Sequence, residues 1–241
     1  MVLRVSSAIL LFILLFGCQS RDVVPKLTGK EYVPVFLGAY WEYSLTETTI
    51  SPVNGQVNNL MDLRVEVSQA YNSGNELIYV LRRSTRPQGT TTYTAAETWS
   101  VRADDFQWVQ QEGNVSFVKL QFPLAEGKSW NGNALNNQGG TEACGDGTFG
   151  CDNYSVNSLR KPFEIPGVLS YDNSVTIIEN NEDDPIVSKD VRKSVYAYGI
   201  GLVYREVTQL EYCTVGDCIG QQVIESGLIT RQTLKSYGVA Q

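Results

Sequence analysis

The side chains that could do chemistry in this chain are carboxylates, thiols and aromatic rings, because the sequence contains no histidine. The absence of histidine excludes nucleophilic pairs that combine serine or cysteine with an imidazole, and it excludes most zinc and iron sites. We therefore expect neither a cofactor nor enzymatic activity.

Two pairs of adjacent acids, Asp104–Asp105 and Asp183–Asp184, are the remaining candidates for acid–base chemistry. Paired carboxylates can hydrolyse glycans, and the second pair, with the preceding asparagines, could bind Ca²⁺. Adjacent acids in a strand point to opposite faces, which favours solvent-exposed turns at both places. The alternative is a carboxylate-dependent hydrolase that acts on envelope or imported glycans.

The first residues of the chain have the features of an export signal. Arg4 precedes an apolar run from Ala8 to Phe16, and Gly17 and Cys18 follow it. The run is shorter than the roughly 20 residues of a membrane-spanning helix, and no later stretch approaches that length. Residues 1–17 are therefore predicted to be a signal peptide.

The L-F-G-C sequence that ends at Cys18 resembles the bacterial lipobox, whose cysteine is lipidated and becomes the first mature residue. The resemblance implies that Cys18 carries acyl chains such as palmitate and anchors the protein in a bilayer. The residue after Cys18 is Gln19 rather than an aspartate, which resembles lipoproteins that are passed on to the outer membrane. The resemblance therefore implies that the body faces the periplasm or the medium. Residues 18–32 show no hydrophobic period and are predicted to be a flexible, lipidated tether.

Charge and composition limit the partners of the remaining chain. The formal net charge of −7 becomes about −8 once the segment with Arg4 is removed, so nucleic acid is excluded as a partner. With 42% hydrophobic residues, residues 33–241 can bury one sizeable core, and we expect a single domain.

Four cysteines after Cys18 form two closely spaced pairs, Cys144 with Cys151 and Cys213 with Cys218. In an exported protein such an even set indicates disulfides. Local pairing would stabilise the fold by about 2–2.5 kcal/mol for each ring in the chain-entropy model. Cross-pairing between the two sets stays open, and a Cys₄ metal site is disfavoured by the wide spacing.

Aromatic residues are numerous, with four tryptophans and thirteen tyrosines. Trp130, Tyr196, Tyr198 and Tyr204 are the candidates that could face a ligand. Half-buried strands collect aromatic residues in any case, so core packing is the favoured role for most of them. The expected partner is an envelope protein, or an amphipathic or glycan ligand bound on a strand face.

Alternating hydrophobicity and turn residues predict strands throughout the body. Turns at 52–55, 72–75, 87–89 and 112–114 divide the first half into a meander of about six strands. Further strands are predicted within 153–156, 168–179, 194–207 and 227–237, and a short helix over 191–194 stays open. The predicted fold is all-β, with about ten antiparallel strands in a curved sheet, half-barrel or sandwich.

The stretch from Phe117 to Asn133 is predicted to join these two blocks of strands. It begins as an alternating strand, bends at Pro123 and Gly127, and leads into an Asn- and Gly-rich loop. We expect Trp130 to pack this loop onto the sheet.

Several segments together resemble an uncharacterised family of Bacteroidota lipoproteins. They are the lipobox, V-P-V-F-L-G-A-Y-W-E-Y from Val33, F-V-K-L-Q-F-P-L-A-E-G-K-S-W-N-G-N-A from Phe117, Y-A-Y-G-I-G-L-V-Y-R-E from Tyr196, and the closing strand. The resemblance implies a lipid-anchored envelope protein with an all-β fold, and it implies no site residues.

Overall fold

The structure, a computed structural model, describes residues 28–137, 142–143 and 149–240. The first half contains the short 3₁₀ helix η1 (Lys30–Tyr32) and then β1 (Ala39–Ser51), β2 (Gly55–Ser73), β3 (Glu76–Pro87), β4 (Thr94–Ala103), β5 (Gln107–Glu112) and β6 (Val115–Gln121). The second half contains β7 (Ser129–Asn131), β8 (Glu142–Ala143), β9 (Phe149–Cys151), β10 (Asn153–Ile165), β11 (Leu169–Asp184), β12 (Ser188–Ala197), β13 (Gly201–Tyr212), the 3₁₀ helix η2 (Gly216–Cys218) and β14 (Ile224–Val239).

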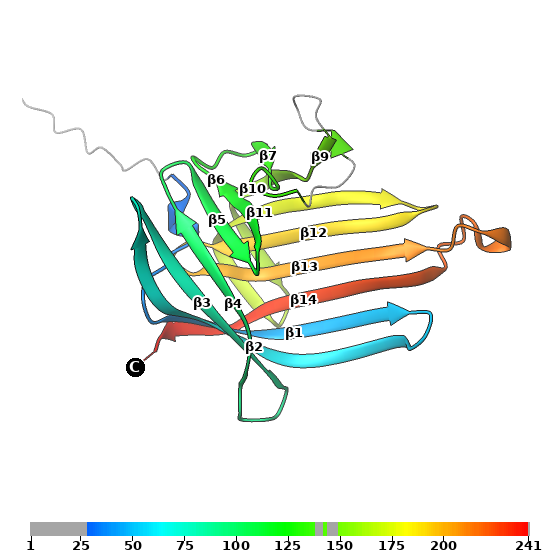
Figure 1. The fold of residues 1–241 in the computed structure, drawn as a ribbon, viewed down its shortest axis with the longest axis horizontal. Coiled ribbons are helices and arrows are strands. Elements are labelled where there is room, and N and C mark those ends of the chain that lie inside the picture. Colours follow the sequence, from blue (N-terminus) through cyan, green and yellow to red (C-terminus); the bar gives the residue numbers. More distant parts are fainter. Residues whose placement is uncertain (1–27, 138–141, 144–148, 241) are drawn as a thin grey trace, which may run out of the picture.

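One curved antiparallel sheet of 12 strands, in the order β6-β5-β4-β3-β2-β1-β14-β13-β12-β11-β10-β7, dominates the molecule (Figure 1). The first and last long strands, β1 and β14, pair at its centre, so each half of the chain forms a meander on one side of that pair. The small pair β8–β9 stands apart from this sheet.

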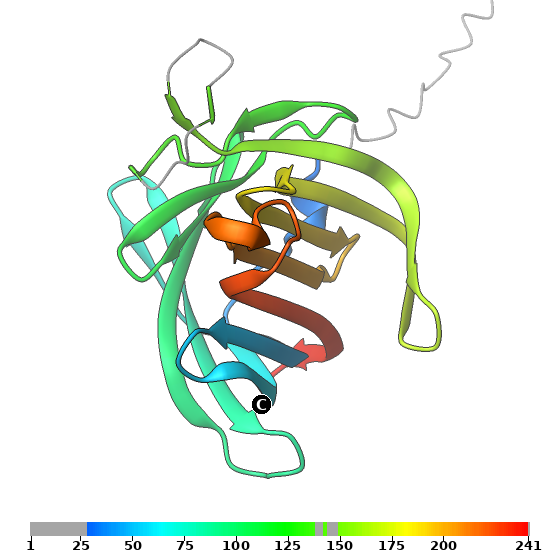
Figure 2. The same cartoon turned by 90° about the vertical axis from the view of Figure 1, so that its right-hand side faces the viewer.

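The two edge strands, β6 and β7, approach each other because the sheet curls strongly (Figure 2). The backbone N–H of Val118 donates to the carbonyl of Gly132 at 2.9 Å, and the Trp130 indole donates to the Val118 carbonyl at 2.7 Å. The Asn136 amide donates to the Ser116 carbonyl at 2.6 Å. The sheet therefore almost closes on itself, and residues 122–128 join its two edges.

The predicted class is confirmed, with a curved sheet rather than a sandwich and 12 strands rather than about ten. The predicted turns at Asn54–Gly55 and at Gly74, Gly89 and Gly113 are also confirmed, since these glycines have φ between +61° and +84°. Positive φ values cost little free energy only for glycine, which is why these glycines lie at the turns between consecutive strands.

The single strand predicted over 194–207 is wrong, because a tight turn divides it into β12 and β13. Gly199 and Gly201 adopt φ of +72° and +109°, and the Ile200 N–H donates to the Ala197 carbonyl at 3.1 Å. Tyr196 lies opposite Leu202 across the hairpin. The two glycines mark a reversal of the chain rather than a bend within one strand. The short helix considered at 191–194 is part of β12.

Residues 28–32 pack against the domain, which differs from the flexible tether predicted through residue 32. Tyr32 is buried, and its hydroxyl donates to Asn173 Oδ1 at 2.6 Å. The Gly199 N–H donates to the Glu31 carbonyl at 2.8 Å, and the Leu124 N–H donates to the Thr28 carbonyl. Burial of one aromatic ring and these bonds fix η1 to the end of the sheet.

Two apolar clusters fill the inside of the curved sheet. The larger one joins both halves of the chain, with Leu120 from β6, Tyr154 from β10 and Ile177 from β11 among its buried members. The smaller one surrounds Tyr43 and Leu63 near the central strands. Within the described ranges, no helix has the length and apolar character needed to cross a bilayer.

Candidate ligand-binding site

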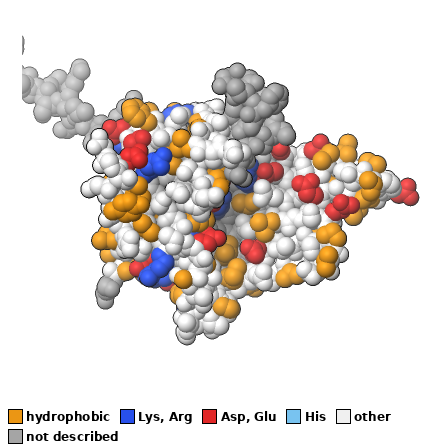
Figure 3. Space-filling view, in the orientation of Figure 1, with side chains coloured by type: hydrophobic (Ala, Val, Ile, Leu, Met, Phe, Trp, Pro, Cys, Tyr) orange, Lys and Arg blue, Asp and Glu red, His pale blue; other side chains and the backbone are white. Residues whose placement is uncertain are grey.

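A pocket of about 90 Å³ lies inside the curved sheet, between the two halves of the chain. Its wall is mainly apolar and aromatic and includes Trp41, Val65, Leu81, Trp99, Trp108 and Leu202. Charged and polar side chains gather in the same pocket, namely Arg83, Lys119, Glu179, Ser194 and Arg205. Figure 3 shows a hollow between the two halves of the sheet with basic side chains at its edge.

Three of the four tryptophans face this pocket, from β1, β4 and β5. The Trp41 indole donates to the Ile200 carbonyl at 2.6 Å, which holds the ring against the β12–β13 turn. A Cβ atom at Gly201 would come within 3.2 Å of the Trp41 indole nitrogen, so the glycine lets the ring lie close to the backbone.

Two β-bulges place opposite charges inside the sheet. On β6, Leu120 pairs with Trp108 and Val118 pairs with Val109, which leaves Lys119 as the extra residue. A bulge changes the direction in which a side chain points, and Lys119 is 4% exposed.

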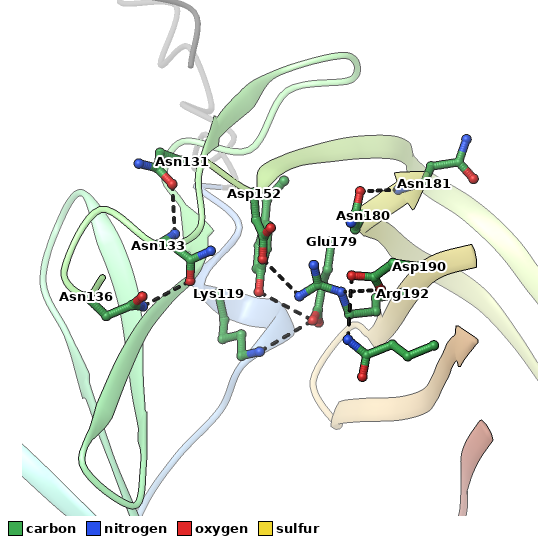
Figure 4. Close-up of polar contacts among 12 residues, drawn as sticks. Lys119, Asn131, Asn133, Asn136, Asp152, Glu179, Asn180, Asn181, Asp190 and Arg192 are labelled. Atoms are coloured by element: carbon green, nitrogen blue, oxygen red, sulfur yellow. Dashed lines mark hydrogen bonds and ion pairs between the residues drawn. The ribbon is translucent and has the colours of Figure 1, made fainter. Parts of the chain in front are cut away.

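The second bulge lies on β11. Ile178 pairs with Lys193 and Asn180 pairs with Arg192, so Glu179 is the extra residue. Glu179 is 1% exposed. Figure 4 shows Glu179 and Lys119 pointing toward each other from opposite halves of the sheet.

Glu179 is the centre of a buried polar network. Its Oε2 lies 3.4 Å from the Lys119 Nζ and 3.4 Å from a terminal nitrogen of Arg205. The Ser194 hydroxyl donates to Oε1 at 2.5 Å, and the Tyr154 hydroxyl lies 3.5 Å from Oε2. These contacts satisfy both carboxylate oxygens, as a buried charge requires.

The pKa of Glu179 is held well below its ordinary value. Burial alone would raise the pKa, but the charges of Lys119 and Arg205 and the hydrogen bond from Ser194 outweigh this effect. The carboxylate is therefore ionised at neutral pH.

A second carboxylate, Glu112, shares the same lysine. The Lys119 Nζ lies 3.3 Å from Glu112 Oε1, and the Gln110 amide donates to that oxygen at 2.9 Å. Burial would raise the pKa of Glu112, but Lys119 and Arg205 lower it below the ordinary value. Both acids near the pocket are thus ionised, and neither provides the protonated carboxyl that a general acid needs.

Of the three cations that line this pocket, Arg83 has the weakest interaction with a carboxylate. Its only ion pair among the described residues is with Glu97 at 3.7 Å, and the Glu97 side chain is 56% exposed to solvent. The guanidinium lies 3.5 Å from the centre of the Trp99 ring. Burial lowers the pKa of Arg83, the charges of Glu97 and Glu112 oppose this effect, and the charge of Arg205 adds to it.

A neighbouring cluster of charges lies beside the network, on β12 and at Asp152, the residue before β10. Arg192 contacts Asp152 at 2.9 Å and Asp190 at 2.9 Å (Figure 4). Asp152 is buried, so this pair is shielded from solvent. Arg192 thus ties the start of β10 to β12 behind Glu179.

The structure places the four aromatic candidates in different surroundings. Tyr196 lines the pocket, and burial raises the pKa of its hydroxyl. Trp130 is buried at the sheet edge, with its ring centre 6.1 Å from that of Tyr154. Tyr204 is buried against Phe163. Tyr198, in the β12–β13 turn, is 44% exposed.

One of the predicted local disulfides is present. Cys213 and Cys218 are bonded in the loop that contains η2. Cys18 and Cys144 lie outside the described residues, and for Cys151 the structure describes only its place in β9.

The acids of the hydrolase alternative take part in turns. Asp104 Oδ1 accepts hydrogen bonds from the N–H groups of Phe106 and Gln107 at 2.6 and 2.7 Å. Asp184 likewise accepts the Ile186 N–H at 2.8 Å.

The neighbouring acids form surface ion pairs, Asp105 with Lys30 and Asp183 with Lys189. In the part of the chain that the structure describes, no group of three or more His, Cys, Asp or Glu side chains is placed to hold a metal ion.

Sequence reasoning missed the Glu179 network. A signal was present in V-T-I-I before Glu179, which is apolar on both faces and therefore belongs to a strand covered on both sides. Such a strand has no solvent face for the charge that follows. Nothing comparable indicates Lys119 or Arg205. Lys119 lies between Val118 and Leu120 as a solvent-facing residue would, and Arg205 is followed by a second charged residue, Glu206.

Comparison with known proteins gives no family for this chain, since neither a protein family nor a curated protein matches it. Three solved structures are similar. A Bacteroides fragilis protein named as exported, with a YmcC-like fold, is 12% identical, with 86% of this chain and 98% of that chain covered and a TM-score of 0.40. A Parabacteroides distasonis protein named as a lipoprotein is 9% identical, with 86% and 98% covered and a TM-score of 0.38. Lipovitellin, from a structure of its lipid–protein interactions, is 8% identical, with 86% of this chain and 26% of that chain covered and a TM-score of 0.39. At these values the likeness establishes neither a family nor a function for this chain.

Proposed function

We propose that this protein is a non-catalytic, lipid-anchored protein of the bacterial cell envelope that binds an amphipathic ligand inside its curved sheet. The observation that carries the proposal is the pocket itself, which has an apolar wall with three tryptophans and a buried charged network in one cavity. Ligand sites commonly combine a mainly apolar lining with a few fixed polar groups.

The envelope location rests on the lipobox that ends at Cys18. Acylation of Cys18 would hold the body at the outer membrane, where amphipathic molecules are abundant. The short length of chain between Cys18 and the packed residues 28–32 would keep the body near the bilayer surface.

An amphipathic ligand fits the pocket better than a glycan. Sugars are bound by aromatic faces together with many hydrogen-bonding side chains, whereas the wall here is largely aliphatic and indole. An apolar chain would replace water against Val65, Leu81 and Leu202, and each buried CH₂ would contribute about 0.8 kcal/mol.

The low pKa values of Glu112 and Glu179 support a binding role over hydrolysis. Paired-carboxylate hydrolysis needs one acid that is protonated near neutral pH. Glu112 and Glu179 instead neutralise fixed cations. The four aspartates of the hydrolase alternative either accept hydrogen bonds in turns or form ion pairs at the surface.

The test is titration of the full chain, held in lipid nanodiscs, with octanoate, octyl phosphate and 1-octanol. Tryptophan fluorescence reports binding, because three of the four indoles face the pocket. We expect saturable binding that Val65→Phe weakens about tenfold by filling the pocket. Val57→Phe is the matched control, since Val57 lies on the same strand and is 42% exposed.

Empty nanodiscs correct for partitioning into lipid. If no C8 probe binds saturably, the proposal fails. If maltopentaose binds where the C8 probes do not, the pocket is a glycan site instead.

A further inference from the structure

The charges around the pocket do not balance. Lys119, Arg83 and Arg205 are three cations that line the pocket, whereas two carboxylates lie against them, the buried Glu179 and the partly buried Glu112. Lys119 contacts both carboxylates, and Arg205 contacts Glu179. One positive charge is therefore left without a buried counter-ion.

Arg83 carries this excess charge. Its partner Glu97 is 3.7 Å away and mostly exposed, so solvent screens the attraction. Glu112 attracts Arg83 only at longer range, since its ion pair is with Lys119, and the charge of Arg205 repels Arg83. The Nε atoms of both arginines are buried and have no hydrogen-bond partner among the described residues. Each guanidinium thus keeps one N–H group without a partner in the described part of the chain, which costs free energy in a shielded site.

We propose that the ligand of this pocket is an anionic amphiphile whose single negatively charged oxyanion head lies near Arg83 and Arg205. This inference rests on the proposed function and adds the chemistry of the head group. A carboxylate or a phosphate monoester would supply the missing negative charge and separate the two arginines electrostatically. The apolar chain would lie along the tryptophan wall, so both ends of the ligand meet matching surfaces.

Substitution of Arg83 is the direct test. The full chain in nanodiscs is titrated with octanoate, octyl phosphate and the uncharged 1-octanol. We expect at least one anion to bind about tenfold more tightly than 1-octanol, and Arg83→Gln to remove that preference without weakening 1-octanol. Arg83→Lys, which keeps the charge, should retain most of the preference.

Arg82→Gln is the matched control. Arg82 neighbours Arg83 on β3 but points to the outer face, where it pairs with Glu66, and its side chain is 55% exposed. Arg82→Gln changes the net charge by the same amount as Arg83→Gln, and it should leave the preference for the anions over 1-octanol unchanged. Arg205→Gln is a second variant, checked for folding by circular dichroism, and should also reduce the preference.

The outcomes separate this inference from the proposed function. Equal binding of 1-octanol and both anions would contradict the proposed anionic head group, but it would leave the proposed ligand-binding pocket uncontradicted. A preference that survives Arg83→Gln and Arg205→Gln would contradict the proposed head group as well. Absence of saturable binding by every C8 probe would instead remove the proposed function. If octanoate binds more tightly than octyl phosphate, the head group is a carboxylate. If octyl phosphate binds more tightly, the head group is a phosphate.

Discussion

The Nζ of Lys119 and the Oε2 of Glu179 lie 3.4 Å apart inside the sheet, and each residue is the extra residue of a β-bulge. Lys119 comes from the first half of the chain and Glu179 from the second. Their contact joins the two halves across the interior, at the charged part of the pocket. Buried pairs of this kind are costly to break, because the remaining partner keeps its charge without compensation.

Glu179→Gln should destabilise the protein by about 3–5 kcal/mol, since Lys119 and Arg205 would lose their shared carboxylate. Urea unfolding of the full chain, followed by tryptophan fluorescence, measures this free energy. Glu211→Gln, on the exposed side of β13, is the control and should change it by less than about 0.5 kcal/mol. Equal effects of the two substitutions would contradict a structural role for the network.

The stability should also fall in acid because of Glu179. Its folded pKa lies below the ordinary value of 4.5, so its contribution is fully present above about pH 4.5 and is lost as the pH falls toward the folded pKa. The difference in unfolding free energy between wild type and Glu179→Gln should therefore be constant from pH 7 to 5. It should shrink by up to about 1.4 kcal/mol per pH unit below 4.5. A difference that does not change down to pH 3 would contradict the lowered pKa.

Removal of the Cys213–Cys218 disulfide should cost about 2 kcal/mol, the value for a ring of this size in the chain-entropy model. The double variant Cys213→Ser, Cys218→Ser tests this by urea unfolding without reductant. Both cysteines lie far along the chain from Glu179, so the pH dependence should stay as in wild type. A loss below about 0.5 kcal/mol would show that the bond stabilises only its own loop.

Cys18→Ser should release the protein from membranes, because the acyl chains predicted at Cys18 are its proposed anchor. Fractionation of cells, with detection of the protein in soluble and membrane fractions, measures the change. Ser20→Ala, two residues away, is the control for altered export. Retention of Cys18→Ser in the outer-membrane fraction would contradict lipid anchoring.

Much of the fold could be predicted because its turns are marked locally. Asn54–Gly55 and Gly113 need positive φ values, and the alternating strands between them need one buried face. The division at Gly199 was not predicted, because Tyr196 to Tyr204 alternates as one strand would. A two-residue period survives a tight hairpin when the turn itself contains small and apolar residues.

The pocket could not be predicted, since it depends on features that break the period. A bulge shifts every later side chain by one position, and both Lys119 and Glu179 lie at such shifts. Their meeting further depends on the closure of the sheet, which brings together positions 60 residues apart. No local pattern records either of these facts.

The pairing of β1 with β14 determines how this chain can fold. Ala39 lies opposite Val239 at the centre of the sheet, so the central ladder joins the beginning and the end of the body. Such long-range contacts slow folding, because the loop between them must close before the contacts form. While the chain folds, β1 therefore keeps one unpaired edge until β14 pairs with it. During that interval the exposed edge is open to pairing with other chains, and the last 16-residue strand completes the sheet.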